Sequence, residues 1–447
     1  MTKQIIFFFF VAFSLAVAAV ESPEFPGGPG GTVDDSGFKG FSHPFPGASR
    51  ERKREFFVGN SFFRDAWVEA PSSTSSRDGL GPTYNAVACA SCHFQDGRGI
   101  GLTAAGEIDI SLLFRLSESA GNPHAAYGDQ LNPIGIGAVP GEGRALVTFT
   151  SVRGTYPDGS EYSLRQPHYT LTDLKFGPFT GQLSPRVAPQ IPGLGLLEAI
   201  SAEDVVASAD PGDQNQDGIS GKANWVRDIR NNKISLGRFG WKAGQPTLEQ
   251  QNAAAFLGDI GITSELFPMP NCPSPQGECA GAISGGDPEV DPKILTRVTL
   301  YTQLIAVPKR RDFGDPEVVK GEEIFHRVNC QSCHRPSYVT GTHDLAELSG
   351  QKIYPYTDLL LHDMGEGLAD GRPEGEASGR EWRTPPLWGI GLIPRVNRHT
   401  HLLHDGRARS VEEAILWHGG EAESAKKAFM ALPAGDRGAL LRFVNSL

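Results

Sequence analysis

The sequence predicts a mainly α-helical fold with long loops, built as two domains of the same kind with one small β-hairpin insertion. Two observations support this prediction. A C-x-x-C-H pattern occurs at Cys89–His93 and again at Cys330–His334, and it is the attachment signature of c-type haem, in which two thiols bond the porphyrin and the histidine ligates iron. The 54 glycines and 33 prolines among 447 residues indicate short helices joined by loops. We therefore expect two cytochrome c-like haem domains.

The two C-x-x-C-H motifs give the most specific chemical prediction. A single copy would also fit a redox-active dithiol, a zinc knuckle or a structural disulfide. Two copies in a chain with an export signal favour haem over these three alternatives. We expect two covalent haem c groups, with His93 and His334 as the proximal iron ligands. The expected attachment residues are Cys89, Cys92, Cys330 and Cys333.

The N-terminal residues 1–18 form the predicted signal peptide. Lys3 provides a positive start, an apolar core runs from Ile5 to Val17, and Ala16–Ala18 supplies an A-x-A cleavage site. An uncleaved anchor is the alternative, but the apolar stretch is short for a membrane span, which needs about 20 residues. We expect a periplasmic or otherwise exported chain with no membrane span after cleavage.

The remaining cysteines are Cys272 and Cys279, in a stretch rich in proline and glycine. In an oxidising compartment, a structural disulfide that closes this small loop is the natural assignment. Free thiols and a catalytic dithiol are the alternatives.

The net charge of −11 bears on the partners of the chain. It argues against binding to nucleic acid and to an anionic membrane surface, because both carry negative charge. It suits a small basic redox protein as electron donor.

The domain boundaries follow from changes in residue pattern. A leader arm at 19–49 is rich in glycine, proline and phenylalanine without periodicity, and we expect it to wrap the surface or to be partly disordered. An N-terminal haem domain, with the disulfide loop, is expected at 50–300. A C-terminal cytochrome c domain is expected at 301–447, with a helix at 317–328 before the second motif and a final helix at 436–447.

Residues 144–174 change character within the N-terminal domain. Strand-forming residues are frequent at 146–152 and at 162–171, and the turn signal Pro157–Gly159 separates them. This pattern predicts the small β-hairpin insertion.

Several further segments carry a resemblance to a known family. The chain resembles the di-haem oxidoreductases, also called thiol-oxidoreductase-like proteins, within the bacterial di-haem cytochrome c peroxidase superfamily. The matching segments span nearly the whole mature chain. They are Gly79–Ala86, Cys92–Gly99, Gly193–Glu198, Gly237–Lys242, Leu361–Gly365, Trp382–Trp388, Leu403–Arg407 and Ala414–Gly420.

The sixth ligand of the second haem can come from several residues. By resemblance, the distal ligand lies on the helix after the H-D-G segment, which places it at His418, where the related peroxidases carry methionine or tyrosine. Met364 is the alternative, because methionine also ligates cytochrome c iron. His362 and His404 are further candidates, and His418 as a surface histidine also stays open.

The first haem has no evident sixth ligand close in sequence, which favours an open iron. The resemblance implies an acid–base glutamate downstream, and Glu198 occupies a comparable place, with Gln190 as a hydrogen-bonding assistant. A surface glutamate at a helix end is the alternative for Glu198. The related enzymes often place a tryptophan between the haems, upstream of that glutamate. This chain has none between Trp67 and Trp225.

Two segments indicate calcium. Asp213, Asn215 and Asp217 resemble the first half of an EF-hand loop, but Asn224 stands at the twelfth position in place of glutamate. A metal-free Asp/Asn turn is the alternative. Separately, Thr384 and Pro386 match a Thr-x-Pro segment that holds calcium in the di-haem peroxidases.

Taken with the resemblance, these features predict a peroxidase-like oxidoreductase. Electrons would pass from the C-terminal haem to the N-terminal haem, where hydrogen peroxide or another small oxidant is reduced. A non-enzymatic electron-transfer cytochrome, a haem sensor and a di-haem oxygenase of an organic polymer are the alternatives.

Overall fold

The computed structural model describes residues 22–103 and 105–447, so the predicted signal peptide and the first residues of the leader arm lie outside the described part. The structure is 28% helix and 18% strand, and many helices are short. The prediction of a mainly α fold built from two cytochrome c-like domains is therefore wrong. The physical reason is the density of glycine and proline, which end helices early and leave much of the chain in loops and short paired strands.

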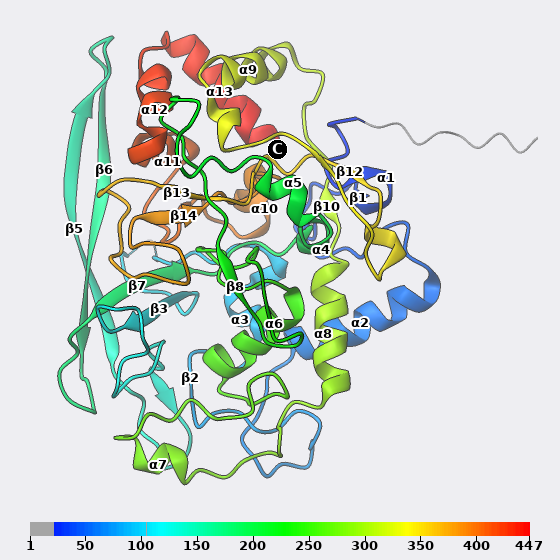
Figure 1. Cartoon of the computed structure of the whole chain (residues 1–447), viewed down its shortest axis with the longest axis vertical. Coiled ribbons are helices and arrows are strands. Elements are labelled where there is room, and N and C mark those ends of the chain that lie inside the picture. Colours follow the sequence, from blue (N-terminus) through cyan, green and yellow to red (C-terminus); the bar gives the residue numbers. More distant parts are fainter. Residues whose placement is uncertain (1–21, 104) are drawn as a thin grey trace, which may run out of the picture.

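A pair of crossed helices supports the first motif. Helix α2 (Arg50–Arg64) precedes the motif and packs against α8 (Pro292–Gln303), as Figure 1 shows. The helices meet at Gly59, where a Cβ atom would lie 2.1 Å from the carbonyl oxygen of Arg297. Any larger residue would therefore push the two helices apart.

A second pair supports the second motif in the same way. Helix α9 (Pro316–Arg327) leads into this motif and packs against the C-terminal helix α13 (Ala434–Ser446). Asp315 caps α9 by accepting hydrogen bonds from its first backbone N–H groups. A Cβ atom on Gly321 would lie 2.0 Å from the carbonyl oxygen of Ala439, so this crossing also depends on glycine.

The β-structure consists of two-stranded sheets within the described ranges. The largest pairs β5 (Arg144–Thr155) with β6 (Glu161–Thr172), a ribbon of 12 residues a side that runs along one side of the molecule (Figure 1). It lies where the sequence predicts a hairpin but is longer than expected. Strand β3 (Leu112–Ser117) pairs with β7 (Gln182–Val187), which leads towards the first motif.

The described part of the leader arm is built into the fold. It contains α1 (Gly28–Gly31) and β1 (Thr32–Val33), and β1 pairs in parallel with β10 (Val307–Pro308). Phe41 and Phe45 are fully buried, and they belong to the two different large hydrophobic clusters of the molecule. The leader therefore connects the two cores.

Cys272 and Cys279 form a disulfide, which confirms that prediction. Within the described residues, no helix is long and apolar enough to cross a membrane.

The remaining elements are short. The other α-helices are α3 (Cys89–Cys92), α4 (Leu194–Glu198), α5 (Ala202–Val206), α6 (Leu248–Ala255), α7 (Gly277–Ala280), α10 (Ile393–Val396), α11 (Val411–Trp417) and α12 (Glu423–Met430). A π-helical turn follows α6 at Phe256–Ile260. The other strands are β2 (Thr83–Tyr84), β4 (Ile134–Gly135), β8 (Trp225–Asp228), β9 (Lys233–Leu236), β11 (Tyr338–Val339), β12 (Lys352–Ile353), β13 (Leu361–Asp363) and β14 (Glu381–Arg383).

Candidate di-haem site

A single cavity of about 410 Å³ joins the two C-x-x-C-H motifs, and we call it the shared cavity. It is lined from the first motif by Cys89, Cys92 and His93, and from the second by Cys330, Cys333 and His334. These four cysteines are not disulfide-bonded. The fold thus brings two motifs that are far apart in the sequence to one cavity, and each motif contributes two free thiols.

The two motif histidines are held by the same kind of hydrogen bond. The Nδ1 atom of His93 lies 2.8 Å from the carbonyl oxygen of Pro189, and that of His334 lies 3.0 Å from the carbonyl oxygen of Tyr356. A carbonyl oxygen can only accept, so Nδ1 donates, and in the neutral ring Nε2 keeps its lone pair for a metal. Desolvation lowers the pKa of both rings to about 4, which keeps them neutral.

His418 also lines the cavity, at the C-terminal end of α11. Its Nδ1 donates to the carbonyl oxygen of Ala414 at 2.7 Å, so its Nε2 also keeps a lone pair. Desolvation lowers the pKa of His418, and the charged form of His418 in turn lowers the pKa of His334. The two imidazoles are thus close enough to act on one another. Met364 lines the same cavity.

His362 is unsuited to bind iron. Its Nε2 lies 2.8 Å from Asp358 and its Nδ1 lies 2.7 Å from Glu421. Burial opposes a charge here, but the two carboxylates raise the pKa of His362 well above its usual value. Both nitrogens therefore carry protons, and neither has a lone pair to give. The sulfur of Cys333 lies 3.6 Å from Nδ1.

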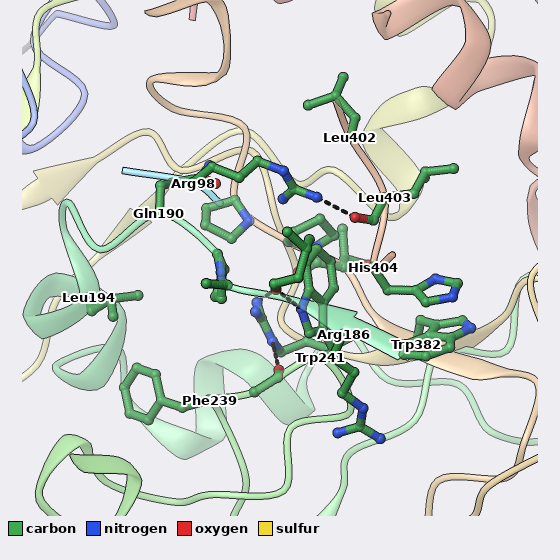
Figure 2. A pocket seen from close by; sticks show the side chains of 18 of the residues that line it. Arg98, Arg186, Gln190, Leu194, Phe239, Trp241, Trp382, Leu402, Leu403 and His404 are labelled. Atoms are coloured by element: carbon green, nitrogen blue, oxygen red, sulfur yellow. Dashed lines mark hydrogen bonds between the residues drawn. The ribbon is translucent and has the colours of Figure 1, made fainter. Parts of the chain in front are cut away.

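An aromatic pair lies deeper in the cavity. The rings of Trp382 and His404 stack with centroids 3.8 Å apart and planes 11° apart (Figure 2). The indole N–H of Trp241 donates to the carbonyl oxygen of Val187 at 2.8 Å, and the N–H of Val187 donates to the carbonyl oxygen of His404 at 2.7 Å. Trp241 and Trp382 follow Glu198 in the sequence. The family resemblance implies a tryptophan upstream of that glutamate, so it did not point to these two residues.

The two predicted acid–base residues differ in position. Gln190 is buried and lines the cavity. Glu198 is not among the lining residues, and its two carboxylate oxygens accept hydrogen bonds from the backbone N–H of Leu248 and from the side chain of Gln303, each at 2.7 Å. His343 lies 3.4 Å from the same carboxylate. These contacts fit a residue that holds the start of α6 in place.

Asp259 is a site residue that the sequence analysis missed. It lies in the π-helical turn after α6, lines the cavity and is close enough to act electrostatically on Cys89 and Cys92. Desolvation raises its pKa to about 6, and Gln130 donates a hydrogen bond to it at 2.8 Å. In the sequence, the signal for Asp259 was an acidic residue inside the otherwise apolar stretch Phe256–Ile260. In the structure this stretch is a π-helical turn, and such turns are frequent at functional sites.

The residues of the predicted EF-hand-like calcium segment lie on an exposed loop. In the described part of the chain, the three or more His, Cys, Asp or Glu side chains whose ligand atoms all lie within 4.8 Å of one another are Cys333, Asp358 and His362. Instead, Asp213, Asn215 and Asp217 accept hydrogen bonds from backbone N–H groups of their own exposed loop.

The Thr-x-Pro segment also has other contacts. The carbonyl oxygen of Thr384 accepts a hydrogen bond from Thr357 at 2.6 Å and one from the guanidinium of Arg383 at 3.1 Å. A neighbouring guanidinium disfavours a bound cation. Pro386 lines the shared cavity.

The comparison with protein families decides the class of the chain. Residues 24–109 and 136–447 match the model described as "Di-haem oxidoreductase, putative peroxidase". The chain belongs to this di-haem oxidoreductase family. The family model includes the β5–β6 hairpin and leaves out residues 110–135. No curated protein and no solved structure matches the chain.

The residues of the shared cavity fit the haem groups that this family implies. Each motif presents two thiols and one neutral histidine with Nε2 free, and both sets line one cavity. Cys89, Cys92 and His93 would hold one haem, and Cys330, Cys333 and His334 the other.

Proposed function

We propose that this di-haem oxidoreductase is an exported, periplasmic c-type peroxidase. Electrons enter at the second motif, Cys330–His334, and are used at the first, Cys89–His93. There, hydrogen peroxide takes up two electrons and two protons and leaves as two water molecules. Bound haem supplies the one-electron redox chemistry.

One observation carries the division of labour between the two motifs. His334 has a second imidazole, that of His418, within electrostatic reach, and both line the shared cavity. No other histidine acts on His93 in this way, and all histidines of the chain lie in the described part. Two strong axial ligands suit electron transfer, whereas a free position suits chemistry on a small oxidant.

A proton source beside the first motif supports the peroxidase activity. Asp259 lines the cavity there, and its pKa of about 6 lets it give and regain a proton near neutral pH. Glu374, another lining carboxylate, is different. Burial opposes its ionisation, but Arg186, Arg372 and Arg115 hold its pKa well below the usual range. Asp259 is therefore the better general acid.

The stacked Trp382 and His404 suit electron passage between the motifs. Trp382 lies opposite His362 in the β13–β14 register, and His362 contacts Cys333. His404 is joined through Val187 to the segment whose Pro189 carbonyl holds His93. The net charge of −11 fits a small basic redox protein as the electron donor.

The proposal is tested on purified, haem-loaded protein. A pyridine haemochrome assay should give two haems per chain. Optical and electron paramagnetic resonance spectra of the oxidised and half-reduced protein should together show one six-coordinate and one open haem, and peroxide should oxidise a reduced donor. Two six-coordinate haems in every redox state, with no peroxide-dependent oxidation, would replace this proposal with a non-enzymatic electron carrier.

A further inference from the structure

Three buried arginines line the shared cavity without a carboxylate partner. Arg98, Arg238 and Arg383 are 5%, 8% and 7% exposed. Among the described residues, no carboxylate oxygen lies within 4 Å of any of these guanidinium groups, although such ion pairs are common elsewhere in the chain.

Backbone carbonyl oxygens are what these guanidinium groups contact. Arg98 donates to His401 at 2.9 Å and also to Leu403 (Figure 2). Arg238 donates to Leu197 at 3.2 Å. Arg383 donates to Gly240 at 3.0 Å and to Thr384 at 3.1 Å. Carbonyl oxygens orient a guanidinium, but they do not neutralise its charge.

The other buried cations of the molecule are paired in the ordinary way. Burial lowers the pKa of Arg98 and Arg383 to about 10, although Asp405 and Asp358 act in the opposite direction from beyond ion-pair distance, so both stay charged at neutral pH without a direct ion pair. A buried charge without a counter-charge is strongly destabilising, so such charges are normally paired. The paired examples are Lys242 with Asp370, Arg407 with Asp405 and Arg310 with Glu322.

We propose that Arg98, Arg238 and Arg383 are anchors for the propionate carboxylates of the two haems. This inference rests on the proposed di-haem function. Propionates are the anionic groups that haem brings into a cavity, and arginine pairs with carboxylates in a bidentate manner.

The position of each arginine in the sequence and its hydrogen bonds indicate which motif it serves. Arg98 follows His93 closely in the sequence, and Arg238 contacts α4, which follows the Pro189 segment that holds His93. Arg98 and Arg238 therefore serve the first haem. Arg383 is linked through the Thr384 carbonyl to Thr357, the residue after Tyr356, whose carbonyl holds His334. Arg383 therefore serves the second haem.

Such anchors would set the redox potential of each haem. A nearby guanidinium favours the reduced state, which carries one positive charge fewer. Removing it should lower the equilibrium constant for reduction on the order of tenfold, which is about 59 mV for one electron. The unpaired propionate would then take up a proton more readily, so the potential should also become more pH-dependent.

The test uses haem-loaded Arg98→Gln and Arg383→Gln, with Arg98→Lys and Arg383→Lys as charge-retaining variants. Arg437→Gln is the matched control, because Arg437 is equally buried but pairs with Asp158 and does not line the cavity. The midpoint potential of each haem is measured by spectroelectrochemistry at several pH values, and the haem content by pyridine haemochrome.

We expect Arg98→Gln to lower the potential of the first haem, Arg383→Gln that of the second, and both lysine variants to restore most of the shift. Haem loss from both glutamine variants, with retention in both lysine variants, also supports the anchors. Unchanged potentials with two haems per chain would overturn the inference and leave the proposed function standing. Wild-type protein without haem would remove the proposed function itself.

Discussion

The two motif-bearing regions share one frame and differ in the side chains that line the cavity beside each motif. In each, a helix before the motif crosses a later helix at a glycine, Gly59 in one and Gly321 in the other. In each, the motif histidine donates Nδ1 to a backbone carbonyl. The second region adds His418, whereas the first adds the carboxyl group of Asp259. A repeated frame thus presents different side chains at its two copies, a second imidazole in one and a carboxyl group in the other.

Removing the proton source of the first region should have the largest effect. We expect Asp259→Asn to slow peroxide turnover by about 10²–10⁴-fold, the usual contribution of general acid–base catalysis. In the wild type, turnover should fall as pH rises through about 6, because the carboxyl group then loses the proton it must donate. The variant should lack this pH dependence. Steady-state kinetics across pH measure both effects, and a variant with wild-type turnover and two bound haems would exclude Asp259 from catalysis.

Replacing His418 should make the second region resemble the first, because neither region would then have a second histidine for its haem iron. In His418→Ala, the second haem should convert from low spin to high spin, while the spectrum of the first stays nearly unchanged. His418→Met should keep the second haem low-spin but raise its potential, because methionine ligation does so. Optical and electron paramagnetic resonance spectra separate these outcomes, and an unchanged spectrum in His418→Ala would move the assignment to Met364.

The shared frame itself can be tested at the helix crossings. Gly59→Ala and Gly321→Ala place a Cβ atom about 2 Å from a carbonyl oxygen, so each should destabilise the fold by about 1–3 kcal/mol. Gly438→Ala, in α13 with nothing within 4 Å of the new Cβ, is the control and should stabilise by about 0.5–1 kcal/mol. Urea unfolding measures all three, and equal values would show that the crossings tolerate a side chain.

The smallest effect is expected at Glu198. Glu198→Gln keeps an oxygen for the N–H of Leu248 but removes a negative charge from the start of α6, which should cost about 0.3–1 kcal/mol. Turnover should stay near that of the wild type, unlike in Asp259→Asn. A loss of turnover as large as that of Asp259→Asn, without loss of stability, would return the acid–base role to Glu198.

Prediction from the sequence succeeded for the family, for the haem cofactors that the family implies and for the disulfide. The C-x-x-C-H motifs and the Cys272–Cys279 pair are short segments whose chemistry depends on near neighbours. The fold class could not be obtained in this way, because glycine and proline shorten helices whose apolar periodicity suggests greater length. The sequence analysis also did not single out Asp259 or the three buried arginines that line the cavity. These residues contact segments that are hundreds of residues away in the sequence, as Arg98 contacts Leu403. No local sequence pattern indicates such long-range contacts.

The leader strand β1 has a consequence for the order of events during synthesis. Its partner Val307–Pro308 emerges long after Thr32–Val33, and at roughly 5–20 residues per second the delay is tens of seconds. Phe45 belongs to the core that also contains Val307, so this core cannot close before then. Cys89 packs against the same core, so the final surroundings of a first-motif thiol also depend on a segment that is made much later.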